Sequence, residues 1–218
     1  MNEFSANFAH QANLFNPRKA KPLTIIGGGS VGSWVAFLAA KMGVNDIVVI
    51  DPDTVDSHNS PMSLYRPSDT GRYKVDALQE IILHMSGLQI GTVKEMYTSQ
   101  AIRRGSVVVS VDLMKSRSDV YACLAGSIKH DILIDTRVEA AYGEVLSIVP
   151  FAKDEQADYE ALLYTDADAR LQTCGNHGVV YNSAGVAAFV CANLARFWTT
   201  GQKQWRHGYK YDTLTPVF

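Results

Sequence analysis

The sequence contains few cysteines, and their spacing excludes two common kinds of site. The three cysteines are Cys123, Cys174 and Cys191. An odd number without a C-x-x-C pair supports neither a disulfide framework nor a four-thiolate zinc site. This cysteine usage is typical of a reducing compartment, and we expect a cytoplasmic protein.

An excess of one charge and long apolar runs are also lacking. The formal net charge of -2 provides no basic surface of the kind that binds nucleic acid or an anionic membrane. The first long apolar run, residues 23–26, has the length of a strand, so we expect neither a signal peptide nor a membrane span. Small molecules or proteins are the expected partners.

The composition is that of a globular chain with one core. Hydrophobic residues make up 47% and charged residues 19% of the 218 residues, which suits a single domain. We expect residues 1–20 to form an N-terminal arm. The polar, acidic segment 152–175 is expected to be a flexible excursion.

Strand-like and helix-like patterns alternate along the chain, which is typical of α/β folds. The expected strands are residues 23–26, 46–51, 90–98, 106–112, 131–138, 143–151 and 205–214, and the expected helices are residues 30–43, 71–87, 113–129 and 185–198. Several strands are continuous apolar runs, as in a parallel sheet buried on both faces. We therefore predict a Rossmann-like mixed sheet, parallel in its first half with antiparallel C-terminal strands, and helices on both faces.

A glycine-rich turn, "TIIGGGSVGSW", follows the first expected strand. Gly27, Gly29 and Gly32 form G-x-G-x-x-G where a helix begins, and Asp51 ends the second strand a little over 20 residues later. Glycines let backbone N–H groups approach a phosphate, and the carboxylate can accept hydrogen bonds from ribose. This context predicts nucleotide binding but does not separate NAD from ATP. Alternatively, the glycines only allow a helix to pack closely on a strand.

The segment "DPDTVDSHNSPMSLYRPSDTGRYKVDAL" resembles the ThiF/MoeB/HesA family of adenylyltransferases, which are related to ubiquitin-activating enzymes. The matching residues are Asp51, Asp53 and Val55, then Asn59, then Asp69, Gly71 and Lys74. "SVDLMKSR" resembles the strand-end aspartate of the family and places Asp112 at the metal position. The resemblance covers roughly residues 5–200.

The resemblance implies a reaction in which a carboxylate attacks the α-phosphate of ATP, giving an acyl adenylate and pyrophosphate. It implies that Lys74 and Asn59 contact phosphate, that Asp112 holds Mg²⁺ and that Asp51 binds the ribose. Asp53 and Ser33 are included among the residues expected to line the nucleotide. The implied substrate is the C-terminus of a ubiquitin-like or sulfur-carrier protein, and the implied assembly is a homodimer whose N-terminal arm completes a neighbouring site.

The sequence departs from the family where phosphate-neutralising arginines are expected. His10, before Gln11, and Met62 occupy those positions. Histidine does not replace an arginine, which is always charged and forks onto phosphate. Arg66 and Arg72, or Arg18 in the arm, are the candidates for supplying the missing charge.

Cys174 aligns roughly with a cysteine that forms a sulfur linkage in some family members. It is a candidate nucleophile, although a buried or incidental cysteine is the commoner interpretation; Cys123 and Cys191 are expected in the core. Two other functions stay open. One is a nucleotide-binding pseudo-enzyme that depends on a partner, favoured by the missing arginines. The other is an NAD-dependent oxidoreductase. It is disfavoured because the sequence shows no obvious second substrate domain and because Asn59 with Lys74 has no role in dinucleotide binding.

Overall fold

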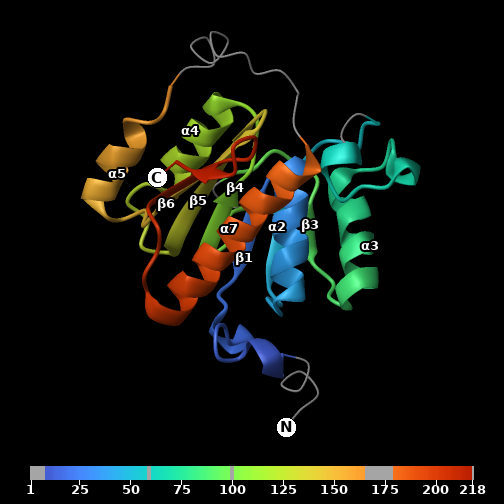
Figure 1. The fold of residues 1–218 in the computed structure, drawn as a ribbon, viewed down its shortest axis with the longest axis horizontal. Helices are drawn as coiled ribbons and strands as arrows, with labels where there is room; N and C mark the ends of the chain where they lie inside the picture. Colours follow the sequence, from blue (N-terminus) through green and yellow to red (C-terminus); the bar gives the residue numbers. More distant parts are fainter. Residues whose placement is uncertain (1–7, 58–59, 99–100, 165–178, 218) are drawn as a thin grey trace.

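The computed structural model describes residues 8–57, 60–98, 101–164 and 179–217. One eight-stranded sheet runs through it in the order β3-β2-β1-β4-β5-β6-β7-β8 (Figure 1). Its strands are β1 Leu23–Ile26, β2 Ile47–Ile50, β3 Gly91–Val93, β4 Gly105–Val109, β5 His130–Glu139, β6 Tyr142–Ile148, β7 Arg206–Lys210 and β8 Thr215–Pro216.

The predicted division of the sheet is confirmed. Strands β3, β2, β1, β4 and β5 are parallel, and β5 to β8 are antiparallel. Every residue of β1, β2 and β4 is buried, because helices cover both faces of the sheet. This burial explains why these strands are continuous β-branched runs without polar alternation.

The helices form two layers. They are α2 Ser30–Lys41, α3 Lys74–Ser86, α4 Met114–Leu124, α5 Lys153–Glu160 and α7 Val180–Thr200. Helices α2, α3 and α7 bury one face of the sheet, and α4 and α5 bury the other. Figure 1 shows α2 and α7 crossing the same face side by side. Of the described helices, none combines the length and apolarity needed to cross a bilayer.

The sheet has a step at its carboxyl edge. Val109, the last residue of β4, pairs with Asp135, so β5 continues for four more residues, 136–139, as a hairpin with β6. At about 3.3 Å per residue the hairpin extends about 13 Å beyond β4. Side chains on the hairpin can therefore reach a ligand bound at the ends of the parallel strands.

The N-terminal arm packs at the opposite, amino edge of the sheet. Its short 3-10 helices are η1 Ala9–Gln11 and η2 Pro17–Lys19. The ring of Phe15 lies 5.9 Å from that of Trp198, and Gln11 Nε2 donates to Met42 O at 2.7 Å. Met42 follows the end of α2, whose 12 residues span about 18 Å from the glycine turn.

Three local expectations differ from the structure. Residues 153–160 form α5 within the segment 152–175, which the sequence predicts to be a flexible excursion; residues 165–175 of that segment lie outside the described residues. Tyr159, at 1% exposure, anchors this otherwise polar helix. Cys123 is exposed, because it lies off the buried stripe of α4 that contains Val120 and Leu124. Met85 follows Leu78 and Ile82 at helical spacing, which predicts it on the apolar face of the expected helix 71–87. It is 52% exposed, so the apolar face of α3 ends one turn early. Cys191 is buried, as expected.

Candidate nucleotide-binding site

The three motif glycines have different structural roles. Gly27 has φ +94, and a Cβ there would lie 2.2 Å from Ser110 O; a Cβ on Gly32 would lie 1.8 Å from Gly27 O. These two glycines permit close contact between β1, β4 and α2. A Cβ on Gly29 would meet no heavy atom within 4 Å among the described residues. Gly29, at the N-terminus of α2, is therefore the position where a phosphate can approach the backbone.

The peptide groups of Gly28 are held by two buried side chains. Gly28 N donates to Asp51 Oδ2 at 2.7 Å, and Tyr65 Oη donates to Gly28 O at 2.5 Å. The glycine turn thus has a fixed shape before any ligand binds. The sequence analysis missed Tyr65, because nothing in "SLYRP" indicates that a chain segment 37 residues away returns to the turn.

Asp51 follows β2 and is 4% exposed. Its Oδ1 accepts a second backbone hydrogen bond, from Asp53 N at 2.8 Å. Burial raises the pKa of Asp51, whereas Lys74 and the two N–H donors oppose that rise. A carboxylate has about four acceptor positions, so Asp51 can hold the turn and still accept a hydrogen bond from a ribose hydroxyl.

Lys74 begins α3 and directs its ammonium group toward this carboxylate. Its Nζ lies 2.8 Å from Asp53 Oδ2 and 3.8 Å from Asp51 Oδ2. Lys74 is 9% exposed, whereas the Asp53 side chain is 65% exposed. The lysine is therefore a nearly buried cation next to the glycine turn, with an exposed counter-ion that an anionic ligand can replace.

Arg66 and Arg72 form a separate ion-pair network. Arg66 Nη2 lies 2.9 Å from Asp69 and 2.7 Å from Glu80, and Arg72 pairs with the same two carboxylates at the same distances. The hydrogen bond from Arg66 is the main cause of the lowered pKa of Asp69. Both guanidinium groups are engaged with these two carboxylates, whose negative charges offset theirs.

Asp112 lies in the loop between β4 and α4 and is exposed. Within the described ranges, no three histidine, cysteine, aspartate or glutamate side chains are grouped as metal ligands. One carboxylate is still a sufficient protein ligand for Mg²⁺, which usually keeps several waters and binds phosphate oxygens. Asp112 therefore fits a metal that arrives with a nucleotide.

The remaining predicted residues lie in different places. Ser33 is buried in α2, where its hydroxyl accepts a hydrogen bond from Leu64 N at 3.3 Å. Asn59 and Cys174 lie outside the described residues. Met62 is in η3, Ser60–Met62, and its carbonyl accepts a hydrogen bond from Trp34 Nε1 at 3.2 Å.

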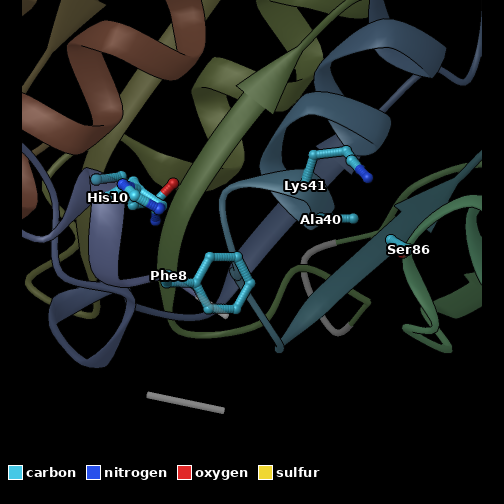
Figure 2. Close-up of a pocket in the computed structure, with 6 residues that line it drawn as sticks. Phe8, His10, Ala40, Lys41 and Ser86 are labelled. Carbon is cyan, nitrogen blue, oxygen red and sulfur yellow. The ribbon is translucent and has the colours of Figure 1, made fainter. Parts of the chain in front are cut away.

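The arm residues are far from the glycine turn in the same chain. His10 belongs to η1 and Arg18 to η2, both at the amino edge. Figure 2 shows His10, Phe8 and Lys41 around a cavity of about 330 Å³ at the end of α2. This cavity is therefore separate from the candidate nucleotide site.

A profile of the ThiF family matches residues 9–215. Over 74 residues, the sequence is 28% identical to ubiquitin-like modifier-activating enzyme 5 of Caenorhabditis elegans; the match covers 34% of this chain and 18% of the relative. Over 64 residues, it is 38% identical to tRNA threonylcarbamoyladenosine dehydratase 1 of Saccharomyces cerevisiae, covering 28% of this chain and 15% of the relative. The chain thus aligns with under a fifth of the length of either curated relative.

Two solved structures have the same fold over the whole chain. PaaA superposes with a TM-score of 0.79 at 15% identity, covering 100% of this chain and 82% of PaaA. Escherichia coli MccB, solved with AMPCPP and MccA, superposes with a TM-score of 0.73 at 18% identity, covering 99% of this chain and 70% of MccB. At these identities the superpositions support the mixed-sheet Rossmann-like architecture.

Proposed function

The chain belongs to the ThiF family, and on that premise we propose that it is an ATP-dependent adenylyltransferase that activates a carboxylate. The observation that carries the proposal is the placement of Lys74. Its ammonium group lies beside the carboxylate of Asp51, which holds Gly28 of the glycine turn. The proposed phosphate cradle, the proposed ribose acceptor and this cation therefore lie at one edge of the sheet.

The chain's own residues would act by binding and charge neutralisation. Gly29 would receive phosphate at the N-terminus of α2, and Lys74 would exchange Asp53 for a phosphate oxygen. Asp112 would hold Mg²⁺, and the metal would supply charge neutralisation at the phosphates. Such electrostatic stabilisation and in-line positioning are the main needs of phosphoryl and nucleotidyl transfer.

The proposed reaction requires no side chain that removes a proton from the nucleophile. A carboxylate is already ionised at neutral pH. One of its oxygens forms a bond to the α-phosphorus, and the bond from that phosphorus to the bridging oxygen of pyrophosphate breaks. The products are an acyl adenylate and pyrophosphate, with the electron pair leaving on pyrophosphate.

The finer parts of the proposal concern partners. A protein C-terminus, as on a ubiquitin-like or sulfur-carrier protein, is the proposed substrate, and its support is the family resemblance. We also propose that the protein is cytoplasmic and that it forms a homodimer. Because Arg18 and His10 lie at the amino edge of their own chain, the arm would have to serve the site of the second copy.

A second candidate is a nucleotide-binding protein without turnover. It is favoured by the engagement of Arg66 and Arg72 with Asp69 and Glu80. If that network stays intact with nucleotide bound, Lys74 is the principal cation of the described site. A partner chain would then have to supply the missing charge.

Calorimetric titration with ATP plus Mg²⁺, and separately with NAD, tests the nucleotide. Heat with ATP and none with NAD is expected, and the Lys74→Met variant should lose most of the ATP signal. Release of AMP and pyrophosphate with a free-carboxylate peptide then separates the enzyme from the binding protein. Binding of NAD alone would overturn the proposal, and ATP binding without pyrophosphate release across C-terminal sequences would favour the second candidate.

A further inference from the structure

A second charged cluster lies next to the candidate site, on the step of the sheet. Asp135 is fully buried and accepts hydrogen bonds from Arg117 Nη1, from Arg137 Nε at 3.0 Å and from Tyr159 Oη at 3.2 Å. Two guanidinium groups therefore share one carboxylate. The cluster carries an excess positive charge in a buried position.

Arg137 is the member whose hydrogen bonds are incomplete. Its Nη1 donates to Leu162 O at 3.1 Å, but its buried Nη2 has no partner among the described residues. Glu144 lies opposite Arg137 in the β5–β6 register, but Arg206 Nε binds that carboxylate. A buried charged donor without an acceptor is unfavourable and calls for a ligand or another partner.

The cluster contacts the loop between β4 and α4 that carries Asp112. Arg117 Nη2 donates to Val111 O, and the next residue is Asp112. Arg137 lies two residues beyond the Val109–Asp135 pair that ends β4, a rise of about 7 Å. Its guanidinium therefore belongs to the projecting part of β5, and Asp135 connects it to Arg117, whose Nη2 contacts the loop that carries Asp112.

We propose that Arg137 binds the carboxylate substrate of the adenylation reaction, specifically the free carboxylate at the end of a peptide chain. The proposal rests on the proposed function of the site. A carboxylate would satisfy Nη2 and neutralise the excess charge of the cluster, and guanidinium and carboxylate are matched in shape for two parallel hydrogen bonds. Arg137 is a substrate-binding residue that no family motif identified in the sequence.

Access requires one side chain to move. The Arg137 side chain is 16% exposed, and the ring of Tyr164 has its centre 5.9 Å from the guanidinium carbon. Tyr164 is itself exposed, and exposed side chains change rotamer rapidly. Turning this ring aside opens the guanidinium to the ligand.

The neighbouring charges favour a carboxylate over a phosphate. Glu144 is opposite Arg137 across the strands, where side chains are about 5 Å apart. Its negative charge repels a phosphate dianion more strongly than a carboxylate monoanion. The nucleotide phosphates would accordingly be bound by Lys74 and the glycine turn, and the attacking group by Arg137.

The test is an NMR titration of the full chain, labelled with ¹⁵N-arginine, with two matched probes, triglycine and triglycinamide. The quantity measured is the chemical shift of the arginine Nε–Hε signals. The Nε–Hε signal of Arg137 is assigned from its disappearance in Arg137→Lys. A saturable shift of this signal with triglycine, and none with triglycinamide, is expected. A shift with both probes, a larger shift with inorganic phosphate, or no saturable shift with triglycine would overturn the proposal.

Variants add a quantitative test. Arg137→Gln should weaken triglycine binding by about tenfold or more, because a charged hydrogen bond is lost, and Arg137→Lys should weaken it less. The control is Arg103→Gln, which removes an exposed arginine paired with Asp46 and should leave the affinity unchanged. Equal affinities in Arg137→Gln and wild type would contradict the proposal. If Arg137→Gln does not fold, the probe comparison on the wild-type chain still decides.

Titration with AMPCPP in parallel separates this inference from the proposed function. Triglycine binding at Arg137 without AMPCPP binding would retain the carboxylate site and remove the adenylation proposal. AMPCPP binding without a triglycine response would retain the nucleotide site and remove the proposed carboxylate site at Arg137.

Discussion

Tyr65 donates a hydrogen bond to Gly28 O at 2.5 Å, while Asp51 accepts one from Gly28 N at 2.7 Å. Two side chains from different segments thus fix the two peptide units that flank the Cα atom of Gly28. The conformation of the glycine turn therefore depends on residues outside the glycine motif.

Replacing Tyr65 with phenylalanine should lower both stability and nucleotide affinity. The buried Gly28 carbonyl would lose its partner, at a cost of about 1–3 kcal/mol. Urea unfolding and calorimetry with AMPCPP measure the two effects. Tyr121→Phe is the matched control, because it removes a hydrogen bond to Glu160; it should lower stability alone. Unchanged AMPCPP affinity in Tyr65→Phe would show that the turn keeps its shape without the hydroxyl.

The glycines give a prediction that separates folding from binding. Gly29→Ala should retain most of the stability and lose nucleotide affinity, since its Cβ would project into open space where phosphate is expected. Gly32→Ala should be strongly destabilised, because its Cβ would lie 1.8 Å from Gly27 O. Thermal unfolding and AMPCPP titration of both variants provide the comparison. Full nucleotide affinity in Gly29→Ala would exclude this position as the phosphate contact.

Lys74→Met should change the pH dependence of stability. The folded-state pKa of Asp51 is already raised by burial, and Lys74 opposes the rise, so removing the lysine should raise that pKa further. A raised carboxyl pKa means that ionised Asp51 opposes folding at neutral pH. This cost is relieved as pH falls through the folded-state pKa toward the unfolded value.

In Lys74→Met, ionised Asp51 should lower the free energy of unfolding at neutral pH by more than in the wild type. The gain in stability on acidification should begin at a higher pH. Urea unfolding from neutral pH down to about pH 4 covers the ordinary carboxyl range. The control is Lys203→Met, which removes a similarly buried lysine paired with Glu155. Parallel pH profiles for Lys74→Met and wild type would contradict the coupling to Asp51.

Asp112→Asn should abolish the Mg²⁺-dependent part of ATP affinity and leave thermal stability near wild type. The side chain is exposed, and an amide is a poorer ligand for Mg²⁺ than a carboxylate. ATP titrations with and without Mg²⁺ measure the effect. Asp119→Asn, also exposed and placed on α4, is the control. If both variants keep the full Mg²⁺ effect, Asp112 does not hold the metal.

Asp69→Asn should be destabilised at neutral pH and approach wild-type stability in acid. Hydrogen bonding from Arg66 lowers the folded-state pKa of Asp69. The stabilisation is therefore complete above the unfolded value and disappears as pH falls through the folded-state pKa. Thermal unfolding across the acidic range tests this. A difference from wild type that does not change with pH would mean that charge is not the cause.

The regular elements and the family could be predicted because their signals are local. Residues 23–26 form β1 at the predicted limits, and Gly87 ends α3 with φ 75. Apolar runs and glycine caps depend on neighbouring residues, which a single sequence displays. The same holds for Asp51 and Lys74, which lie where strand ends and helix starts place them.

The unpredicted features depend on contacts between distant segments. Helix α5 has almost no apolar pattern, and one buried aromatic residue, Tyr159, anchors it. Tyr65 contacts a residue 37 positions away. Arg137 Nη2 has no partner among the described residues, while Arg206 binds the facing Glu144. Asp135 and Arg137 in "IDTRV" nevertheless indicate a buried polar cluster, because ionisable groups at the end of a buried strand need partners.

The contact of Gly27 with Ser110 joins the glycine turn to the Asp112 loop through backbone atoms alone. Ser110 N donates to Ile26 O at 2.8 Å, and a Cβ on Gly27 would collide with Ser110 O. A shift in one loop must therefore displace the other, whatever side chains they carry. A substitution that displaces the Asp112 loop would therefore also displace the glycine turn, so the proposed metal position and the proposed phosphate position would vary together.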